Sequence, residues 1–170
     1  MKVLKKVLVG LVILGMTFGV VGFNGGDVKA ASAGVGYQAH VQDIGWQGLA
    51  ANGGVAGTIG KSKRMEAISI FLLEVPMSAS QGIQYSAHVQ DIGWQSWKQN
   101  GAVAGTTGQL KRMEAIKISL FGNISKSYNI QYRAHVQDYG WLAWQSNGSI
   151  AGTTGKGKRL EAIQIQLVRK

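Results

Sequence analysis

Apolar and polar residues alternate along several stretches of this chain. In the stretch 83–90 every second residue is apolar, beginning with Ile83, and the residues between them are polar. A period of two that includes aromatic and β-branched residues predicts a strand buried on one side. A second alternating stretch, 115–120, places Ile116, Ile118 and Leu120 on one face. No ten-residue window after residue 30 shows a helical period, so the pattern predicts an all-β protein.

These stretches belong to a pattern of 36 residues that occurs three times without a gap, at 37–72, 85–120 and 132–167, with 21 columns identical in all three copies. The shared frame reads Y-x-A-H-V-Q-D-x-G-W, then N-G-x-x-A-G-T-x-G, then K-R-x-E-A-I-x-I-x-L. A repeat of this length is typical of repeat architectures. Asn100-Gly101 predicts a tight turn, and Gly105 and Gly108 indicate a second bend or a close backbone approach.

One such unit cannot bury its apolar face alone, so we expect the three copies to close around a pseudo-threefold axis. A β-prism, with one sheet per repeat, and a β-trefoil both fit the period, and an open array of repeats is the remaining alternative. We expect three or four short strands per repeat. Three strand signals are clear, and the third is long and apolar, which favours the prism-like arrangement. The linkers 73–83 and 121–130 carry Ser, Asn, Gly and the single proline and are expected to be loops. Residues 31–170 would then form a single domain.

Residues 1–30 have the layout of an export signal. Lys2, Lys5 and Lys6 precede an uncharged apolar segment, and Val28-Lys29-Ala30 resembles a signal-peptidase site. A retained membrane anchor is the alternative, but the uncharged segment is short for a stable span and contains several glycines. We therefore expect cleavage near Ala30 and a secreted, extracellular protein that meets the membrane only through its signal.

The charge balance narrows the choice of partners. The chain carries 18 basic and 8 acidic side chains, and removal of residues 1–30 leaves 14 basic and 7 acidic ones, a net charge of +7. This excess favours anionic partners such as wall polymers, acidic glycans or phospholipid headgroups. Nucleic acid also suits the charge, but an exported protein rarely meets it, so no nucleic-acid partner is expected. The sequence contains no cysteine, which excludes disulfides and thiolate chemistry.

The frame H-V-Q-D-x-G-W, G-x-x-A-G-T-x-G, K-R-x-E-A-I-x-I resembles the clostridial hydrophobic W repeat, known as the ChW repeat. The resemblance covers all three copies and hence nearly the whole chain after residue 30. It implies a secreted or surface protein of a Gram-positive bacterium with a role in extracellular interaction or attachment. It implies no particular ligand, catalytic mechanism or site residue.

Five tryptophans are candidate ligand-binding residues. Three of them, Trp46, Trp94 and Trp141, occupy the invariant G-W step. We interpret these three as core rings that fill the space around the axis, with ligand binding as the alternative. The other two, Trp97 and Trp144, align with Leu49 in the first copy. They are either an exposed platform for a sugar ring or a second packing layer.

Four polar residue types recur at the same place in each copy and are candidates for ligand binding or for structural ion pairs. They are His40, His88 and His135; Asp43, Asp91 and Asp138; Arg64, Arg112 and Arg159; and Glu66, Glu114 and Glu161.

Arg112 and Glu114 lie two apart in a predicted strand and therefore share with Ile116 the face that we expect to be the core face. We interpret each Arg–Glu pair as a partly buried ion pair that also takes Asp91, or its equivalent, or a turn carbonyl as partner. The alternative is a ligand pocket lined by Arg and carboxylate. One histidine and one carboxylate per repeat are too few for a metal site unless the repeats meet on the axis. No metal and no other cofactor is therefore expected, and a hydrogen-bonded histidine is the preferred interpretation.

The sequence contains no G-x-S-x-G, H-E-x-x-H or P-loop motif, and each acid recurs in identical surroundings, so we expect no enzyme. Three matching sets of aromatic and polar groups suit a multivalent binder. The predicted function is a lectin-like module for carbohydrate or an anionic cell-wall polymer at up to three equivalent sites. There, Lys63, Lys111 and Lys158 with the adjacent arginines would supply positive potential. The alternative is an extracellular protein-interaction, adhesion or surface-assembly module with surface proteins as partners.

Overall fold

The computed structural model describes residues 33–170, which form fifteen strands and one short helix. The predicted export signal lies outside the described residues. The first repeat forms β1 (Gly34–Val41), β2 (Gly45–Trp46), β3 (Ala50–Ala51), β4 (Ala56–Gly57) and β5 (Met65–Leu73). The second forms β6 (Gly82–Val89), β7 (Gly93–Trp94), β8 (Lys98–Gln99), β9 (Ala104–Gly105) and β10 (Met113–Phe121). The third forms β11 (Tyr128–Val136), β12 (Gly140–Trp141), β13 (Gln145–Ser146), β14 (Ala151–Gly152) and β15 (Leu160–Arg169). Each repeat thus has two long strands and three of only two residues, rather than three or four strands.

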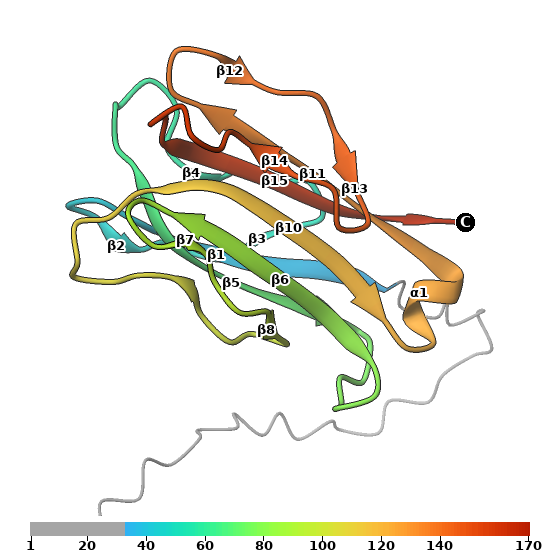
Figure 1. Ribbon diagram of the computed structural model, residues 1–170. Helices are drawn as coiled ribbons and strands as arrows, with labels where there is room; N and C mark the ends of the chain where they lie inside the picture. The colour runs from blue at the N-terminus through green and yellow to red at the C-terminus, as the bar shows by residue number, and fades with distance from the viewer. Residues whose placement is uncertain (1–32) are drawn as a thin grey trace, which may run out of the picture. The chain divides into compact units, whose positions relative to one another are not determined.

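The strands form three separate antiparallel sheets of five strands, one around each repeat. Figure 1 shows the three long hairpins, β1–β5, β6–β10 and β11–β15, side by side, with α1 (Ile124–Ser127) at the right of the view near the C-terminus. This arrangement confirms the all-β prediction and agrees with one sheet per repeat rather than with a β-trefoil.

The ring of sheets is closed by exchange of short strands between repeats. Strand β9 of the second repeat pairs with β5 of the first, β14 of the third pairs with β10 of the second, and β4 of the first pairs with β15 of the third. Because the last exchange returns to the first repeat, every sheet is completed by a strand from another copy. The pseudo-threefold closure expected from the sequence is therefore present in the pairing pattern.

Glycine is required where the exchanged strand crosses its neighbour. Gly105 has φ +99°, and a Cβ atom there would lie 2.3 Å from the carbonyl oxygen of Glu66 and 2.6 Å from Cα of Ala67. Gly57 and Gly152 make the same close approach to the sheets that they complete. The Gly105 position flagged in the sequence is thus a close backbone approach between repeats.

The Asn-Gly step forms the predicted tight turn and also joins repeats. Asn100 (φ +46°) and Gly101 (φ +92°) form the turn, and the amide of Ala102 donates to the carbonyl of Gln99 at 2.9 Å. The Oδ1 of Asn100 accepts a hydrogen bond from the Ile83 amide at 3.0 Å. The Gly101 amide donates to Ile70 of the preceding repeat at 2.8 Å.

The core between the three sheets contains the predicted alternating residues and three fully buried tyrosines: Tyr37, Tyr85 and Tyr132. The phenol of Tyr85 donates to the carbonyl of Ala102 and accepts from the amide of Ile70. The other two phenols make the corresponding pair of bonds. Burial raises the pKa of each phenol.

The linker after β10 departs from the expected loop. It contains α1, whose Ile124 is buried against the core. A helix of one turn is shorter than any window in which a helical period can be recognised. Within residues 33–170 no helix is long and apolar enough to cross a membrane.

Candidate functional site

The outer face of each sheet carries one tryptophan and one histidine in contact. In the second repeat, Ile83, Tyr85 and their alternating partners point into the core, so His88 points outward. Trp94 pairs with His88 across the β6–β7 ladder and therefore lies on the same outer face. The two ring centroids are 5.3 Å apart, with the ring planes at 79°. We call the outer face of each sheet around this contact a Trp face. The three Trp faces are centred on His40 and Trp46, His88 and Trp94, and His135 and Trp141.

The Trp faces of the three repeats share this geometry. The other two contacts join His40 to Trp46 and His135 to Trp141, at 5.5 and 5.4 Å. Trp46 is 42% exposed, and Trp94 and Trp141 are partly buried. The interpretation of these three tryptophans as core rings is therefore wrong. Tyrosine occupies the core instead, because its hydroxyl can bond the backbone groups that meet there. Each tryptophan pairs across the ladder with a histidine that points outward, so the indole lies on the outer face.

A second apolar side chain lies near each of these tryptophans in sequence and is exposed. Trp97 is 46% exposed, Trp144 is 39% exposed and Leu49 is 56% exposed. The sequence left two alternatives open for Trp97 and Trp144, an exposed platform or a second packing layer. In the structure both side chains lie at the surface. The second and third repeats thus present two indoles each, and the first presents one.

Behind each Trp face lies a buried carboxylate with two partners. In the second repeat, Oε1 of Glu114 lies 2.8 Å from Nη2 and 3.0 Å from Nε of Arg112, and Oε2 lies 3.1 Å from Nδ1 of His88. The other repeats contain the same arrangement, built from Arg64, Glu66 and His40 and from Arg159, Glu161 and His135. The glutamate side chains are only 6–9% exposed.

The face on which this ion pair lies was predicted wrongly. Met113, not Glu114, is in the core cluster with Ile116. The register between β6 and β10 shifts at Glu114, since Val89 pairs with Met113 and His88 pairs with Ala115. This β-bulge inserts one residue and reverses the alternation on its N-terminal side, so Glu114 reaches the histidine on the outer face.

The buried carboxylate lies beside the histidine ring. Nδ1 of His88 is buried 3.1 Å from Oε2 of Glu114, but the contact lacks the geometry of a hydrogen bond. The hydrogen-bonded histidine expected from the sequence is therefore not formed at Nδ1. Within residues 33–170 no hydrogen bond engages a histidine Nε2. The side chain of His88 is 18% exposed, so this nitrogen is the polar group that the face can offer to a ligand.

The invariant aspartates have a different partner from the one expected. Oδ2 of Asp91 lies 3.0 Å from Nζ of Lys111, and the pairs Asp43–Lys63 and Asp138–Lys158 measure 2.6 Å each. The expectation that Asp91 joins the Arg–Glu pair is therefore wrong, and histidine takes that place. The hydrogen bond from Lys63 lowers the pKa of the Asp43 carboxyl. These ion pairs are exposed, with aspartate side chains 60–65% exposed, so each contributes little stability.

Two cations on the Trp faces were not singled out in the sequence. Lys117 places its Nζ 4.2 Å from the ring centroid of Trp94. Arg133 places its Cζ 4.8 Å from the centroid of Trp141 and 4.9 Å from that of Trp144. Both residues occupy variable columns of the repeat, whereas the candidate residues were chosen from the invariant columns. Lys117 and Arg133 alternate with core residues in β10 and β11, and this alternation predicts that they point outward.

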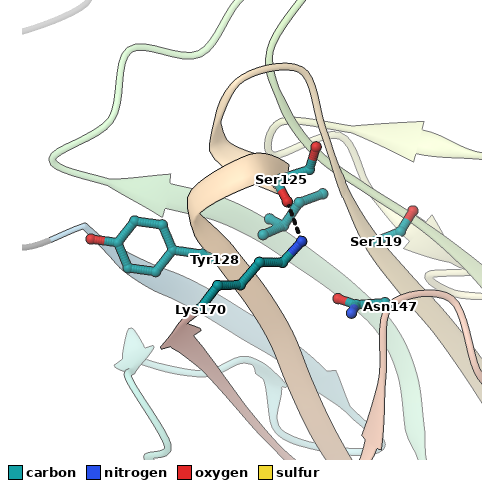
Figure 2. Close-up of a pocket in the computed structure, with 6 residues that line it drawn as sticks. Ser119, Ser125, Tyr128, Asn147 and Lys170 are labelled. Atoms are coloured by element: carbon teal, nitrogen blue, oxygen red, sulfur yellow. Dashed lines mark hydrogen bonds between the residues drawn. The ribbon is translucent and has the colours of Figure 1, made fainter.

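One pocket beside α1 lies apart from the invariant polar residues. It measures about 330 Å³ and is lined by Ser119, Leu120, Ser125, Tyr128, Asn147 and Lys170. Figure 2 shows the Lys170 side chain reaching the carbonyl of Ser125 beside α1, a bond of 2.8 Å. Apart from Leu120 and Asn147, its lining comes from variable or linker positions, so it is not a threefold site.

Among the described residues no group of three or more His, Cys, Asp or Glu side chains is placed to hold a metal ion.

The repeated outer face agrees with a known family pattern. The family model described as Clostridial hydrophobic W matches three times, at residues 40–74, 88–122 and 135–169, which together cover more than half of the chain. The chain belongs to the ChW family. No curated protein and no solved structure matches it.

The ChW matches coincide with the site. Each match begins at the histidine of the Trp face and runs past the Arg–Glu pair to the end of the second long strand. The core tyrosine lies three residues before each match. A ChW repeat in this chain is therefore the segment that builds one Trp face, and residues 40–169 contain three such repeats.

Proposed function

We propose that this protein is a secreted, non-catalytic binding module for carbohydrate or an anionic cell-wall polymer, and that the three Trp faces are its ligand sites. The observation that carries the proposal is the outward position of the invariant indoles, each beside an oriented histidine. Core packing does not explain indoles at this position. The net charge of +7 on residues 31–170 adds attraction for acidic polymers.

The chemistry of a Trp face suits a sugar. An indole offers a flat apolar surface with a polar edge, on which the C–H face of a pyranose ring packs. Nε2 of His88 lies next to Trp94 and accepts a hydrogen bond from a hydroxyl of the stacked ring. The His88 ring packs against Trp94 and lies beside the Glu114 carboxylate, so the acceptor is positioned before the ligand arrives, which reduces the ordering cost of binding.

The absence of catalysis is part of the proposal. Each invariant glutamate is engaged by an arginine and a histidine, and each invariant aspartate by a lysine. Glycoside hydrolysis needs two carboxylates facing one bond in different environments, about 5–9.5 Å apart. Three weak sites on one rigid body instead support multivalent attachment, which raises avidity by about 10²–10⁴ without new contacts.

The secreted location is likewise proposed, and it is supported by the export-signal pattern of residues 1–30 and by membership of the ChW family. It is tested by mass spectrometry of the N-terminus of protein recovered from culture medium, where cleavage near Ala30 is expected.

Binding is tested with residues 31–170 on a glycan array and in sedimentation with purified cell walls. We expect saturable binding that weakens with Trp94→Ala and Trp97→Ala and is competed by free sugars. Leu110→Ala is the matched control, because Leu110 is 76% exposed and lies outside the Trp faces. Folded protein that binds no glycan and no wall preparation would refute the proposal.

A protein-interaction or surface-assembly role is the second candidate. It is favoured by exposed apolar side chains on the loops, among them Ile92 at 47% and Val103 at 45%. In that case binding would be competed by proteins and not by sugars, and Ile92→Ser with Val103→Ser would weaken it more than Trp94→Ala does.

A further inference from the structure

The three Trp faces differ from one another at the variable columns. One such column holds Gln38, Ser86 and Arg133, and another holds Ser69, Lys117 and Gln164. In the first repeat, Gln38 donates to the carbonyl of Gln47 and Ser69 donates to that of Gly101. Both polar side chains of the first face are therefore engaged within the fold, and neither is charged.

The second and third faces each hold one cation against the invariant indole, and the two cations come from different strands. Lys117 reaches Trp94 from β10, whereas Arg133 reaches Trp141 and Trp144 from β11. Two different columns of the repeat thus each place a positive charge over the invariant indole. The Nε of Arg133 also donates to Oε1 of Gln164 at 2.7 Å, which fixes the guanidinium.

These two cations are not neutralised by the protein. The six cations of the K-R step form ion pairs with the six invariant acids. Within residues 33–170 no carboxylate lies within ion-pair distance of Lys117 or Arg133. The positive charge that a ligand meets at an indole is therefore that of Lys117 and Arg133, not that of the invariant lysines.

We propose that the second and third Trp faces recognise an acidic group carried on a sugar polymer, whereas the first face is a neutral site. This inference rests on the proposed function and names its ligand class. In the second face, Lys117, whose Nζ lies 4.2 Å from the ring centroid of Trp94, pairs with the acid of the sugar bound at that face. In the third face, the planar guanidinium of Arg133 takes the acid with two parallel hydrogen bonds.

Two chemical sources provide such a group, a uronic acid carboxylate and a polyol phosphodiester. The test measures tryptophan fluorescence and calorimetric binding of residues 31–170 with polygalacturonate, with its fully methyl-esterified form, and with poly(glycerol phosphate). The ester is the matched neutral ligand, because it keeps the sugar backbone and removes only the charge.

We expect the protein to bind at least one acidic polymer about tenfold more tightly than the neutral ester at low salt, with the difference shrinking as salt screens the charges. The polymer that binds more tightly identifies the source of the acid. Lys117→Gln with Arg133→Gln should remove most of the difference. Lys61→Gln with Lys126→Gln removes the same charge from exposed positions outside the Trp faces and should leave most of it.

The outcomes separate the two proposals. Equal binding of acid and ester, or equal losses in the two double variants, would overturn the anionic recognition and leave a neutral lectin standing. Binding to none of these polymers, with saturable binding to another glycan or wall preparation, would overturn only the ligand class. Folded protein that binds nothing in either experiment would overturn both.

Discussion

The phenol oxygen of Tyr85 accepts a hydrogen bond from the backbone amide of Ile70 at 3.0 Å, and these two residues belong to different repeats. The same oxygen donates to the carbonyl of Ala102 in the Asn-Gly turn of its own repeat. One buried hydroxyl therefore satisfies two backbone groups on either side of a repeat boundary. Tyr37 and Tyr132 do the same at the other two boundaries.

Tyr85→Phe is expected to destabilise the domain by about 1–3 kcal/mol, because it leaves a buried amide and a buried carbonyl without a partner. The measurement is the free energy of unfolding in urea. Tyr139→Phe is the control, because Tyr139 is 50% exposed and should change stability by less than about 0.5 kcal/mol. Equal effects of the two substitutions would show that the phenol bonds contribute nothing to closure of the ring.

Stability should fall at alkaline pH. Burial raises the pKa of Tyr37, Tyr85 and Tyr132 above that of the unfolded chain. Below about pH 10 all three are protonated in both states and their contribution is fully present. Above that pH the unfolded chain releases protons that the folded protein retains, so stability declines until the folded pKa is reached, by up to about 1.4 kcal/mol per pH unit for each tyrosine.

Urea unfolding between about pH 8 and pH 11 measures this slope, since the tyrosines of an unfolded chain titrate near 10. Tyr85→Phe should reduce the slope by about one third, because one of the three equivalent buried groups is removed. A slope that Tyr85→Phe leaves unchanged would assign the alkaline loss to other groups.

Gly105→Ala should disrupt the exchanged strand. The new Cβ would lie 2.3 Å from a backbone oxygen, and the backbone has φ +99°. We expect a loss of about 3–5 kcal/mol in the free energy of unfolding, at the upper end for single substitutions. Gly108→Ala is the control, because Gly108 also has positive φ but no atom within 4 Å of the added methyl. Faster amide exchange at Ala67, the pairing partner of Gly105, would locate the damage even in a variant that still folds.

The sequence predicted most of the fold because its local signals agree with the tertiary structure. Alternation in 83–90 identified the buried face of β6, and Asn100-Gly101 identified a turn, since both depend on nearest neighbours alone. The exchange of β4, β9 and β14 between repeats could not be read in the same way. Ala-Gly pairs of two residues carry no period, and their partners lie in another copy.

The candidate site was predicted less well than the fold. The invariant Trp94 was recognised as important but assigned to the core, because a large aromatic ring is apolar wherever it lies. Its true position depends on its pairing with His88, which only the register of β7 reveals. Glu114 was placed on the wrong face because one inserted residue reverses the alternation, and the sequence of β10 does not mark where that residue is inserted.

The buried and the exposed ion pairs of each repeat should respond differently to loss of charge. Glu114→Gln keeps the size of the side chain but leaves Arg112 without a counter-charge and weakens the contact to His88. Breaking a pair of this burial is expected to cost about 3 kcal/mol or more. Asp91→Asn removes the partner of Lys111 at an exposed turn and should cost less than about 1 kcal/mol. Urea unfolding of both variants measures the difference.

A second readout separates the structural from the positioning role of Glu114. If Glu114 holds the proton of His88 on Nδ1, nitrogen NMR of the folded Glu114→Gln variant should show a larger population of the other tautomer, and Asp91→Asn should not. Binding to glycan should then weaken in Glu114→Gln even where the protein remains folded, because Nε2 is no longer held as an acceptor beside Trp94. An unchanged tautomer with unchanged binding would limit Glu114 to stabilising the bulge and would leave the indoles as the only recognition groups of the Trp faces.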